Sequence, residues 1–264
     1  MGLIGLSLFL VVSCEKSTGT DEVSINEYNM ESPTVSNVDA QDVLNTLENL
    51  QDELLEERES TGCPTITSIG PKGSFPNVVT VDYGAGCTDK KGRYHSGKIV
   101  IEQSDSMHNP GATRKTTFIN FGLDSVKLKN GTIMLSNESG ENDKKFVRKT
   151  NGMTITGPKG SLEIQSIHAR IQVKGGDTKD KSDDIWKIEG ESSGTVAGEI
   201  KFSAVIKEPL ILKGDCPFIV NGKEEVTRNG HKAIVDYGNG ICDRLAKGTK
   251  ENGDTFVIVL RPRF

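Results

Sequence analysis

The segments VDYGAGCTD (residues 81–89) and VDYGNGICD (residues 235–243) decide the fold. Each lies downstream of a Cys-Pro pair, Cys63-Pro64 in the first copy and Cys216-Pro217 in the second. Chance does not produce this constellation twice in 264 residues, so the chain carries an internal duplication. Apolar residues that alternate up to a glycine-rich turn are typical of β-hairpins. The duplicated unit is therefore predicted to be a hairpin module.

Each module places its second cysteine at the bend of the hairpin. A glycine-containing turn follows (Lys91-Gly92 or Lys247-Gly248), and an alternating strand comes next, at residues 98–102 or 255–260. Four cysteines formally allow three disulfide pairings. The duplication selects pairing within each copy, which closes loops that stabilise the fold by roughly 3 to 4 kcal/mol each. The predicted modules span residues 61–103 and 214–262, with disulfides Cys63–Cys87 and Cys216–Cys242.

The aspartates that both copies share allow two interpretations: Asp82 with Asp89, and Asp236 with Asp243. Paired carboxylates can bind calcium beside backbone carbonyls or act as acid and base. Asp beside a glycine-rich turn also accepts hydrogen bonds from nearby backbone amides. Because both copies share the pattern as part of one hairpin, we favour the turn role. The four aspartates remain candidate calcium ligands, and no cofactor is expected.

The first twelve residues are almost wholly apolar and lead into Val11-Val12-Ser13-Cys14. A stretch of about a dozen apolar residues has the length of a signal-peptide core and is too short to span a bilayer. The segment resembles a bacterial lipobox, although no Lys or Arg precedes the apolar run. We therefore predict a signal peptide at residues 1–13 and a lipid on Cys14. Export also favours disulfides over free thiols.

The lipobox and the two Cys-Pro to Asp-Tyr-Gly-x-Gly modules together resemble uncharacterised lipoproteins of Bacteroidetes-type bacteria. The resemblance covers both modules well and the intervening strands loosely. It implies a lipid-anchored location in the cell envelope and implies no chemistry. Glu15-Lys16 follows Cys14, in place of the aspartate associated with retention in the inner membrane, which favours the outer membrane.

The remaining chain is predicted to comprise one tether, one helix and one β domain. Residues 14–37 are polar and are predicted to form a flexible tether. Leucines at three- and four-residue steps predict an amphipathic helix over residues 38–60, with Asp39 as its N-cap and a solvated acidic face. That face consists of Glu48, Asp52, Glu53, Glu56, Glu57 and Glu59.

Residues 61–264 are predicted to be mainly β, with antiparallel meander or sandwich-like sheets. Asn-Gly pairs favour hairpin turns. They occur at Asn130-Gly131, Asn151-Gly152, Asn221-Gly222, Asn229-Gly230 and Asn252-Gly253. Between residues 161 and 173 the apolar phase slips by one residue, which predicts a β-bulge or a tight bend near residues 165–167.

Composition and motifs exclude several classes of function. The net charge is −5 and no basic stripe is present, so nucleic-acid binding is not expected. The chain has no Cys-x-x-Cys pair, and its four histidines are scattered singly, so no zinc site is expected. No nucleophile elbow, metalloprotease motif or phosphate-binding loop occurs. We therefore predict no catalytic residue and no enzymatic activity.

The leading hypothesis is a non-enzymatic binding or structural module of the envelope. Its partners would be the membrane, through the lipid, and an envelope protein or surface ligand. One alternative is a carrier of lipid or other apolar cargo in a groove lined by Ile164, Ile171 and Phe202. A second is a hydrolase whose residues are dispersed in sequence. Its base would be His95, His108 or His168.

Overall fold

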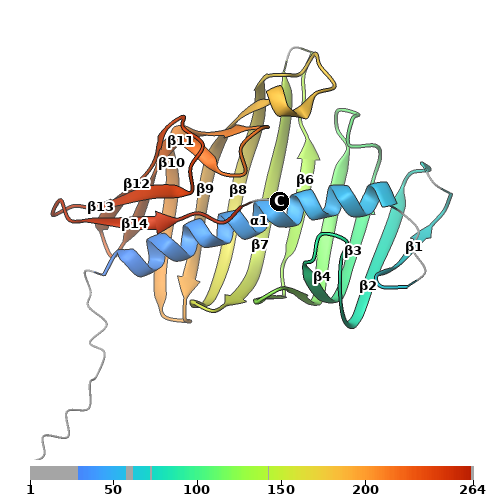
Figure 1. Cartoon of the computed structure of the whole chain (residues 1–264), viewed down its shortest axis with the longest axis horizontal. Helices are drawn as coiled ribbons and strands as arrows, with labels where there is room; N and C mark the ends of the chain where they lie inside the picture. Colours follow the sequence, from blue (N-terminus) through green and yellow to red (C-terminus); the bar gives the residue numbers. More distant parts are fainter. Residues whose placement is uncertain (1–28, 58–61, 72, 142, 263–264) are drawn as a thin grey trace, which may run out of the picture.

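The computed structural model of the chain describes residues 29–57, 62–71, 73–141 and 143–262 (Figure 1). One long helix, α1 (Glu31–Glu57), lies across the face of a curved antiparallel sheet. The described residues contain fourteen strands and one short 3-10 helix, η1 (Lys181–Asp183). The strands are β1 (Thr65–Ile69), β2 (Asn77–Thr88), β3 (Tyr94–Gln103), β4 (Thr113–Leu123), β5 (Val126–Lys129), β6 (Thr132–Asn137), β7 (Lys144–Gly157), β8 (Gly160–Lys174), β9 (Ile185–Val196), β10 (Ile200–Lys213), β11 (Ile219–Arg228), β12 (His231–Asn239), β13 (Leu245–Lys250) and β14 (Thr255–Val259).

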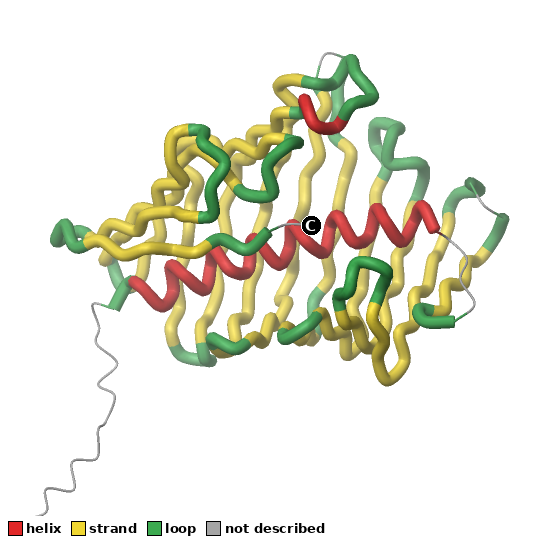
Figure 2. Tube along the Cα trace, in the orientation of Figure 1, coloured by secondary structure: helices red, strands yellow, loops and turns green. Residues whose placement is uncertain are grey.

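All strands of the described chain belong to a single sheet that follows the order of the sequence. The order is β1-β2-β3-β4-β5-β7-β8-β9-β10-β11-β12-β13-β14, and β6 pairs with both β4 and β7. The predicted mainly β fold, antiparallel meander and N-terminal helix are confirmed. The layer that packs against the sheet is α1, so helix and sheet share one hydrophobic core (Figure 2).

The duplicated modules form the two ends of this sheet, and both predicted disulfides are present. Cys63 is bonded to Cys87, 24 residues apart, and Cys216 to Cys242, 26 residues apart. Asp82 of β2 pairs with Lys98 of β3, and Asp236 of β12 pairs with Lys247 of β13. The third strand of the second module is therefore β13, and the predicted turn at Lys247-Gly248 is wrong. The strand at residues 255–260 corresponds instead to β14, the next strand along.

Two of the five Asn-Gly pairs join hairpins as predicted. Asn229-Gly230 connects β11 to β12, and Asn252-Gly253 connects β13 to β14. Asn151-Gly152 and Asn221-Gly222 lie instead inside β7 and β11, at shifts of strand register. Asn130-Gly131 separates β5 from β6. Both of these strands pair with β4 on one side and with β7 on the other. Asn and Gly tolerate the positive φ angles of bulges, so these pairs interrupt strands as readily as they join them.

A line of such interruptions crosses the sheet. Gly84 of β2 pairs with Gly97 of β3, where the register shifts. Gly97 in turn lies so close to the backbone of Asn120 in β4 that no Cβ would fit. Asn120 itself has a φ of 48°. Because bulges bend strands and increase local twist, this line curves the sheet around α1.

Buried and exposed residues alternate in β8 from Leu162 to His168, so the bulge or tight bend predicted near residues 165–167 does not lie in this strand. Ser166 and His168 are buried, whereas Ile167 is 40% exposed. The register shift lies in the facing strand β7, between Thr150 and Met153. The apolar pattern misassigned the two faces because polar side chains occupy inward positions on this strand.

Helix α1 begins at Glu31, seven residues before the predicted start at residue 38. The predicted tether at residues 14–37 is therefore helical from residue 31 onward. Asp39, the predicted N-cap, lies inside the helix. Pro33 sits in the first turn, where its missing N–H removes no helical hydrogen bond. The first turns are polar, so an apolar period could not reveal them.

The leucine stripe of α1 lies in the core as predicted, with Leu44 and Leu47 fully buried. A second stripe, which we call the polar stripe, runs beside it along the helix. It comprises Asn37, Gln41, Asn45, Glu48 and Asp52. Steps of three and four residues place these side chains on one flank of the helix.

The polar stripe docks onto polar side chains of the sheet. Ser192 of β9 donates to Asn37 Oδ1 at 2.7 Å, and Arg114 of β4 pairs with Asp52 at 2.6 Å. The prediction of a solvated acidic face is therefore wrong at Glu48, whose side chain is only 8% exposed. The reason is that arginines on the sheet compensate its charge. Glu56 is exposed as predicted.

Candidate functional site

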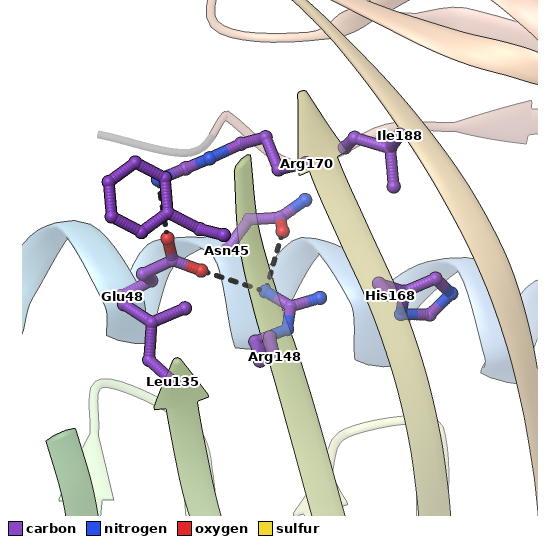
Figure 3. A pocket seen from close by; sticks show the side chains of 8 residues that line it. Asn45, Glu48, Leu135, Arg148, His168, Arg170 and Ile188 are labelled. Atoms are coloured by element: carbon purple, nitrogen blue, oxygen red, sulfur yellow. Dashed lines mark hydrogen bonds and ion pairs between the residues drawn. The ribbon is translucent and has the colours of Figure 1, made fainter. Parts of the chain in front are cut away.

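A polar cluster between α1 and the middle of the sheet surrounds a cavity of about 20 Å³ (Figure 3). Glu48 comes from the polar stripe, Arg148 from β7, and His168 and Arg170 from β8. These four residues are called the arginine cluster below. The cavity is completed by Asn45, Leu135, Phe146 and Ile188.

Strand register brings the arginine cluster together. Arg148 pairs with His168 across β7 and β8, and Phe146 pairs with Arg170 one inward position further along. Gly190 of β9 lies opposite His168, where an added Cβ would come within 2.9 Å of the His168 Cα. The sheet backbone therefore packs closely beside the imidazole, and a larger residue at position 190 would displace it.

The Glu48 carboxylate is shared between two guanidinium groups. Its Oε1 lies 2.7 Å from Arg170 Nη2, and its Oε2 lies 3.4 Å from Arg148 Nη1. Arg148 also donates to Asn45 Oδ1 at 2.8 Å and to Gln41 Oε1 at 3.2 Å. These two amide oxygens carry no formal charge. One carboxylate thus faces two cations.

Burial and charge set the protonation states in the cluster. Burial opposes ionisation of Glu48, but the guanidiniums of Arg170 and Arg148 outweigh it and hold the pKa of Glu48 below its ordinary value. Burial lowers the pKa of Arg148. Burial, reinforced by the charge of Arg148, lowers the pKa of His168 to about 3. His168 is therefore neutral at physiological pH, and the cluster carries one excess positive charge.

Aromatic rings flank the outer arginine. The Arg170 guanidinium lies 4.9 Å from the centroid of Trp186 and 5.9 Å from that of Phe146. Lys144 Nζ lies 5.6 Å from the Trp186 ring. Cation–π contacts of this kind orient a guanidinium without neutralising it. The Arg170 side chain is 28% exposed, so the cluster reaches solvent at this end.

Three buried nitrogen atoms of the cluster have no hydrogen-bond partner among the described residues: Arg148 Nε, Arg170 Nε and His168 Nδ1. A buried polar atom without a partner costs free energy, so such atoms indicate a missing acceptor. The cavity lining contains no Ser, Thr or Cys that could act as a nucleophile. The arrangement is suited to binding an acceptor of hydrogen bonds.

A second buried titratable group lies at the other half of α1. Glu224 of β11 is 1% exposed and accepts a hydrogen bond from the Tyr237 hydroxyl of β12 at 3.4 Å. Burial raises the pKa of Glu224 to about 7, and burial together with Glu224 raises that of Tyr237 well above its ordinary value. Burial likewise raises the pKa of Asp42 to about 7, although Asp42 accepts a hydrogen bond from the Arg261 N–H.

Replacing Glu224 with Gln should remove a pH-dependent loss of stability. Folded Glu224 keeps its proton up to about pH 7, whereas the unfolded carboxyl loses it near pH 4.5, so stability falls between these values and stays low above them. Glu224→Gln should therefore raise the free energy of unfolding at pH 8 by about 2 to 3 kcal/mol and change it little at pH 4. Urea unfolding at both pH values measures this.

The neighbouring Glu225 provides the control for that experiment, because it pairs with Lys232 and its side chain is 21% exposed. Glu225→Gln should leave the pH dependence of the wild type unchanged. A Glu224→Gln protein that loses stability between pH 5 and 8 as steeply as the wild type would contradict the assigned role of Glu224.

The four candidate calcium ligands all serve their turns. Asp82 Oδ1 accepts from Gly84 N, and Asp236 Oδ1 from Gly238 N, both at 2.9 Å. The remaining two, Asp89 and Asp243, accept from the backbone amides two residues further on, at 2.9 and 2.8 Å. The two copies thus share these bonds from turn amides to aspartates, as the turn interpretation predicts. In the described ranges, no group of three His, Cys, Asp or Glu side chains is placed to hold a metal ion.

The histidines considered as catalytic bases lie in separate places. His95 is buried, contacts Asp89 Oδ2 at 2.9 Å and stacks on Tyr83 at 4.7 Å. His108 instead contacts a hydroxyl, that of Ser106, which lies 3.2 Å from its Nδ1. The carboxylate is therefore the partner of one histidine, and the hydroxyl is the partner of another.

The arginine cluster was not predicted from the sequence, although one pattern in the sequence points to it. The polar stripe of α1 repeats at helical spacing beside the leucines. This spacing indicates that a second flank of the helix also contacts the rest of the protein. Arg148 lies two residues before Thr150 and Arg170 two residues after His168, so strand alternation places each arginine on the same face as a buried residue. Which strand faces which helix residue, however, depends on register across a sheet of many strands. The predicted lipidation site Cys14, the signal at residues 1–13 and the tether up to residue 28 lie outside the described residues.

The fold and the cluster together define a curved antiparallel sheet with a helix packed on its inner face and a buried cationic site between them. No protein-family model, curated protein or solved structure matches the chain. Within the part of the chain that the structure describes, no helix has the length and apolarity needed to cross a bilayer.

Proposed function

We propose that this chain is a lipid-anchored protein of the bacterial cell envelope, held by Cys14, whose folded part acts as a non-enzymatic binding or structural module. The outer membrane is the favoured location. The proposal rests on the lipobox-like segment ending at Cys14 and on the two disulfides, which are typical of exported proteins.

The observation that favours a module over a carrier is the occupied inner face of the sheet. Ile164 and Phe202, two of the three residues expected to line an apolar groove, are 0% and 5% exposed and share the core with α1. The third, Ile171, is half-buried. Two cavities that α1 helps to line measure about 20 and 40 Å³. Ligand pockets usually measure hundreds of cubic ångströms, so an apolar cargo would have to displace α1.

The separation of the histidine partners favours the same proposal over a hydrolase. A hydrolytic site needs a nucleophile, a base and an orienting group within hydrogen-bond reach of one another. His95 has a carboxylate partner and His108 a hydroxyl partner. His168 lies in the arginine cluster, where burial and then the charge of Arg148 disfavour a protonated imidazole.

Intact-mass measurement of the protein purified from its own envelope tests the proposal. The expected mass is that of the chain from Cys14 onward with a covalent diacylglycerol, and native mass spectrometry should find no additional lipid. In a Cys14→Ser variant the covalent lipid should be absent and the protein should leave the membrane fraction. A full-length, unlipidated wild type would overturn the anchor, and a stoichiometric non-covalent lipid would overturn the module in favour of a carrier.

A further inference from the structure

We propose that the arginine cluster binds one small monovalent anion, of the size of chloride, in the cavity between α1, β7 and β8. The inference is independent of where the protein resides and of whether Cys14 is lipidated. It rests on an excess of buried positive charge, on unpartnered N–H groups and on the size of the cavity.

The charge balance of this cluster differs from that of Arg114 and Arg93, which also pair with carboxylates of α1. Arg114 of β4 is 3% exposed and pairs with one carboxylate, that of Asp52. Arg93 contacts two carboxylates, those of Glu53 and Asp89. Arg148 and Arg170 have a single carboxylate between them. A buried charge without compensation is costly, so the cluster favours a bound anion.

The residues that line the cavity carry donors suited to an anion. Arg148 Nε and Arg170 Nε are buried N–H groups without a partner in the described chain. His168 Nδ1 is also unpartnered, and the neutral imidazole can carry its proton there. Glu48 also lines the cavity, and its oxygens are held by the two guanidiniums (Figure 3). Glu48 therefore limits the affinity for an anion but leaves the donors available.

The cavity volume selects the class of anion. A volume of about 20 Å³ exceeds the 10 to 15 Å³ needed for one water molecule, and it leaves no room for sulfate or phosphate. Chloride is a single atom slightly larger than water and accepts several N–H groups at once. Access from solvent is provided beside Arg170, whose side chain is 28% exposed between Phe146 and Trp186.

Thermal unfolding tests the proposal when sodium chloride replaces sodium gluconate at constant ionic strength. A ligand that binds only the folded state raises the midpoint in a saturable manner. We expect such a rise for the wild type with chloride and with bromide. Arg170→Gln should abolish it. Glu48→Gln should tighten the apparent Kd for chloride by roughly tenfold to a hundredfold, because one opposing charge is removed close to the site.

The matched control is Arg114→Gln, which alters a buried arginine of the same helix–sheet interface whose charge is already paired. This variant should keep the full chloride dependence. Arg170→Lys retains the charge but loses the flat set of donors, so it should weaken chloride binding without abolishing it.

Bromide anomalous scattering from crystals of the full chain locates the ion. A peak in the cavity lined by Arg148 and His168 supports the proposal. Water alone in that cavity overturns it. Equal unfolding midpoints of the wild type in chloride and gluconate, or a chloride effect that survives Arg170→Gln, would also overturn it.

Discussion

Removing the second disulfide, through Cys216→Ala together with Cys242→Ser, is expected to lower the free energy of unfolding by about 3 to 4 kcal/mol. The bond closes a loop between residues 26 apart in sequence, and its loss frees that loop in the unfolded state. Cys216 is fully buried, so its replacement also removes packed atoms from the interior. Urea unfolding monitored by circular dichroism measures the loss.

The first disulfide separates the effect of loop closure on the unfolded state from the effect of lost packing in the folded state. It joins residues 24 apart, so its effect on the unfolded state should be almost the same. Cys63, in contrast to Cys216, is exposed. A variant with Cys63→Ser and Cys87→Ser should therefore lose somewhat less stability than the variant of the second bridge. Indistinguishable unfolding of the wild type and either variant, with intact bridges in the wild type, would contradict the stabilising role of the disulfides.

The parts of the fold that local sequence determines were predicted from it. The disulfide pairing follows from the duplication, because two copies of one module must be bridged alike. The leucine stripe of α1 identifies a helix through spacing alone. Antiparallel order follows from short connections between strands, and the sheet indeed follows chain order from β7 to β14.

The errors arise where a local pattern has two structural solutions. Asn-Gly favours positive φ angles, and a bulge inside β7 satisfies that preference as well as a hairpin turn does. The faces of β8 were inverted because its inward positions hold Ser166 and His168 while Ile167 points outward. Alternation identifies a strand, but the environment of each face is set by the helix that packs on it.

The arginine cluster was beyond prediction for the same reason. Arg148 and Glu48 are 100 residues apart, and they meet because α1 packs against the sheet. Sequence alone assigns an acidic helix residue and a basic strand residue to solvent, which is where most such residues lie. Their burial requires that their opposite charges compensate each other, and the tertiary structure is what brings the two charges together.

Replacing Glu48 with Gln is expected to lower the free energy of unfolding by about 3 to 5 kcal/mol, because it leaves the buried guanidinium of Arg148 and that of Arg170 without a counter-charge. Gln keeps the volume and an acceptor oxygen, so the loss reports charge rather than packing. The measurement is urea unfolding in sodium gluconate, where no chloride can replace the missing charge.

Two further variants decide whether the loss comes from the uncompensated charge. Glu56→Gln changes an exposed carboxylate about two turns further along α1 and should cost less than about 1 kcal/mol. A triple variant with Glu48→Leu, Arg148→Met and Arg170→Met removes all three charges and should recover most of the stability, since apolar residues of similar size can replace a buried ionic group. If Glu48→Gln costs no more than Glu56→Gln, the helix is not held to the sheet by this carboxylate. If the triple variant is less stable than Glu48→Gln, the cluster stabilises the fold through its hydrogen-bond geometry, and charge compensation is not its main role.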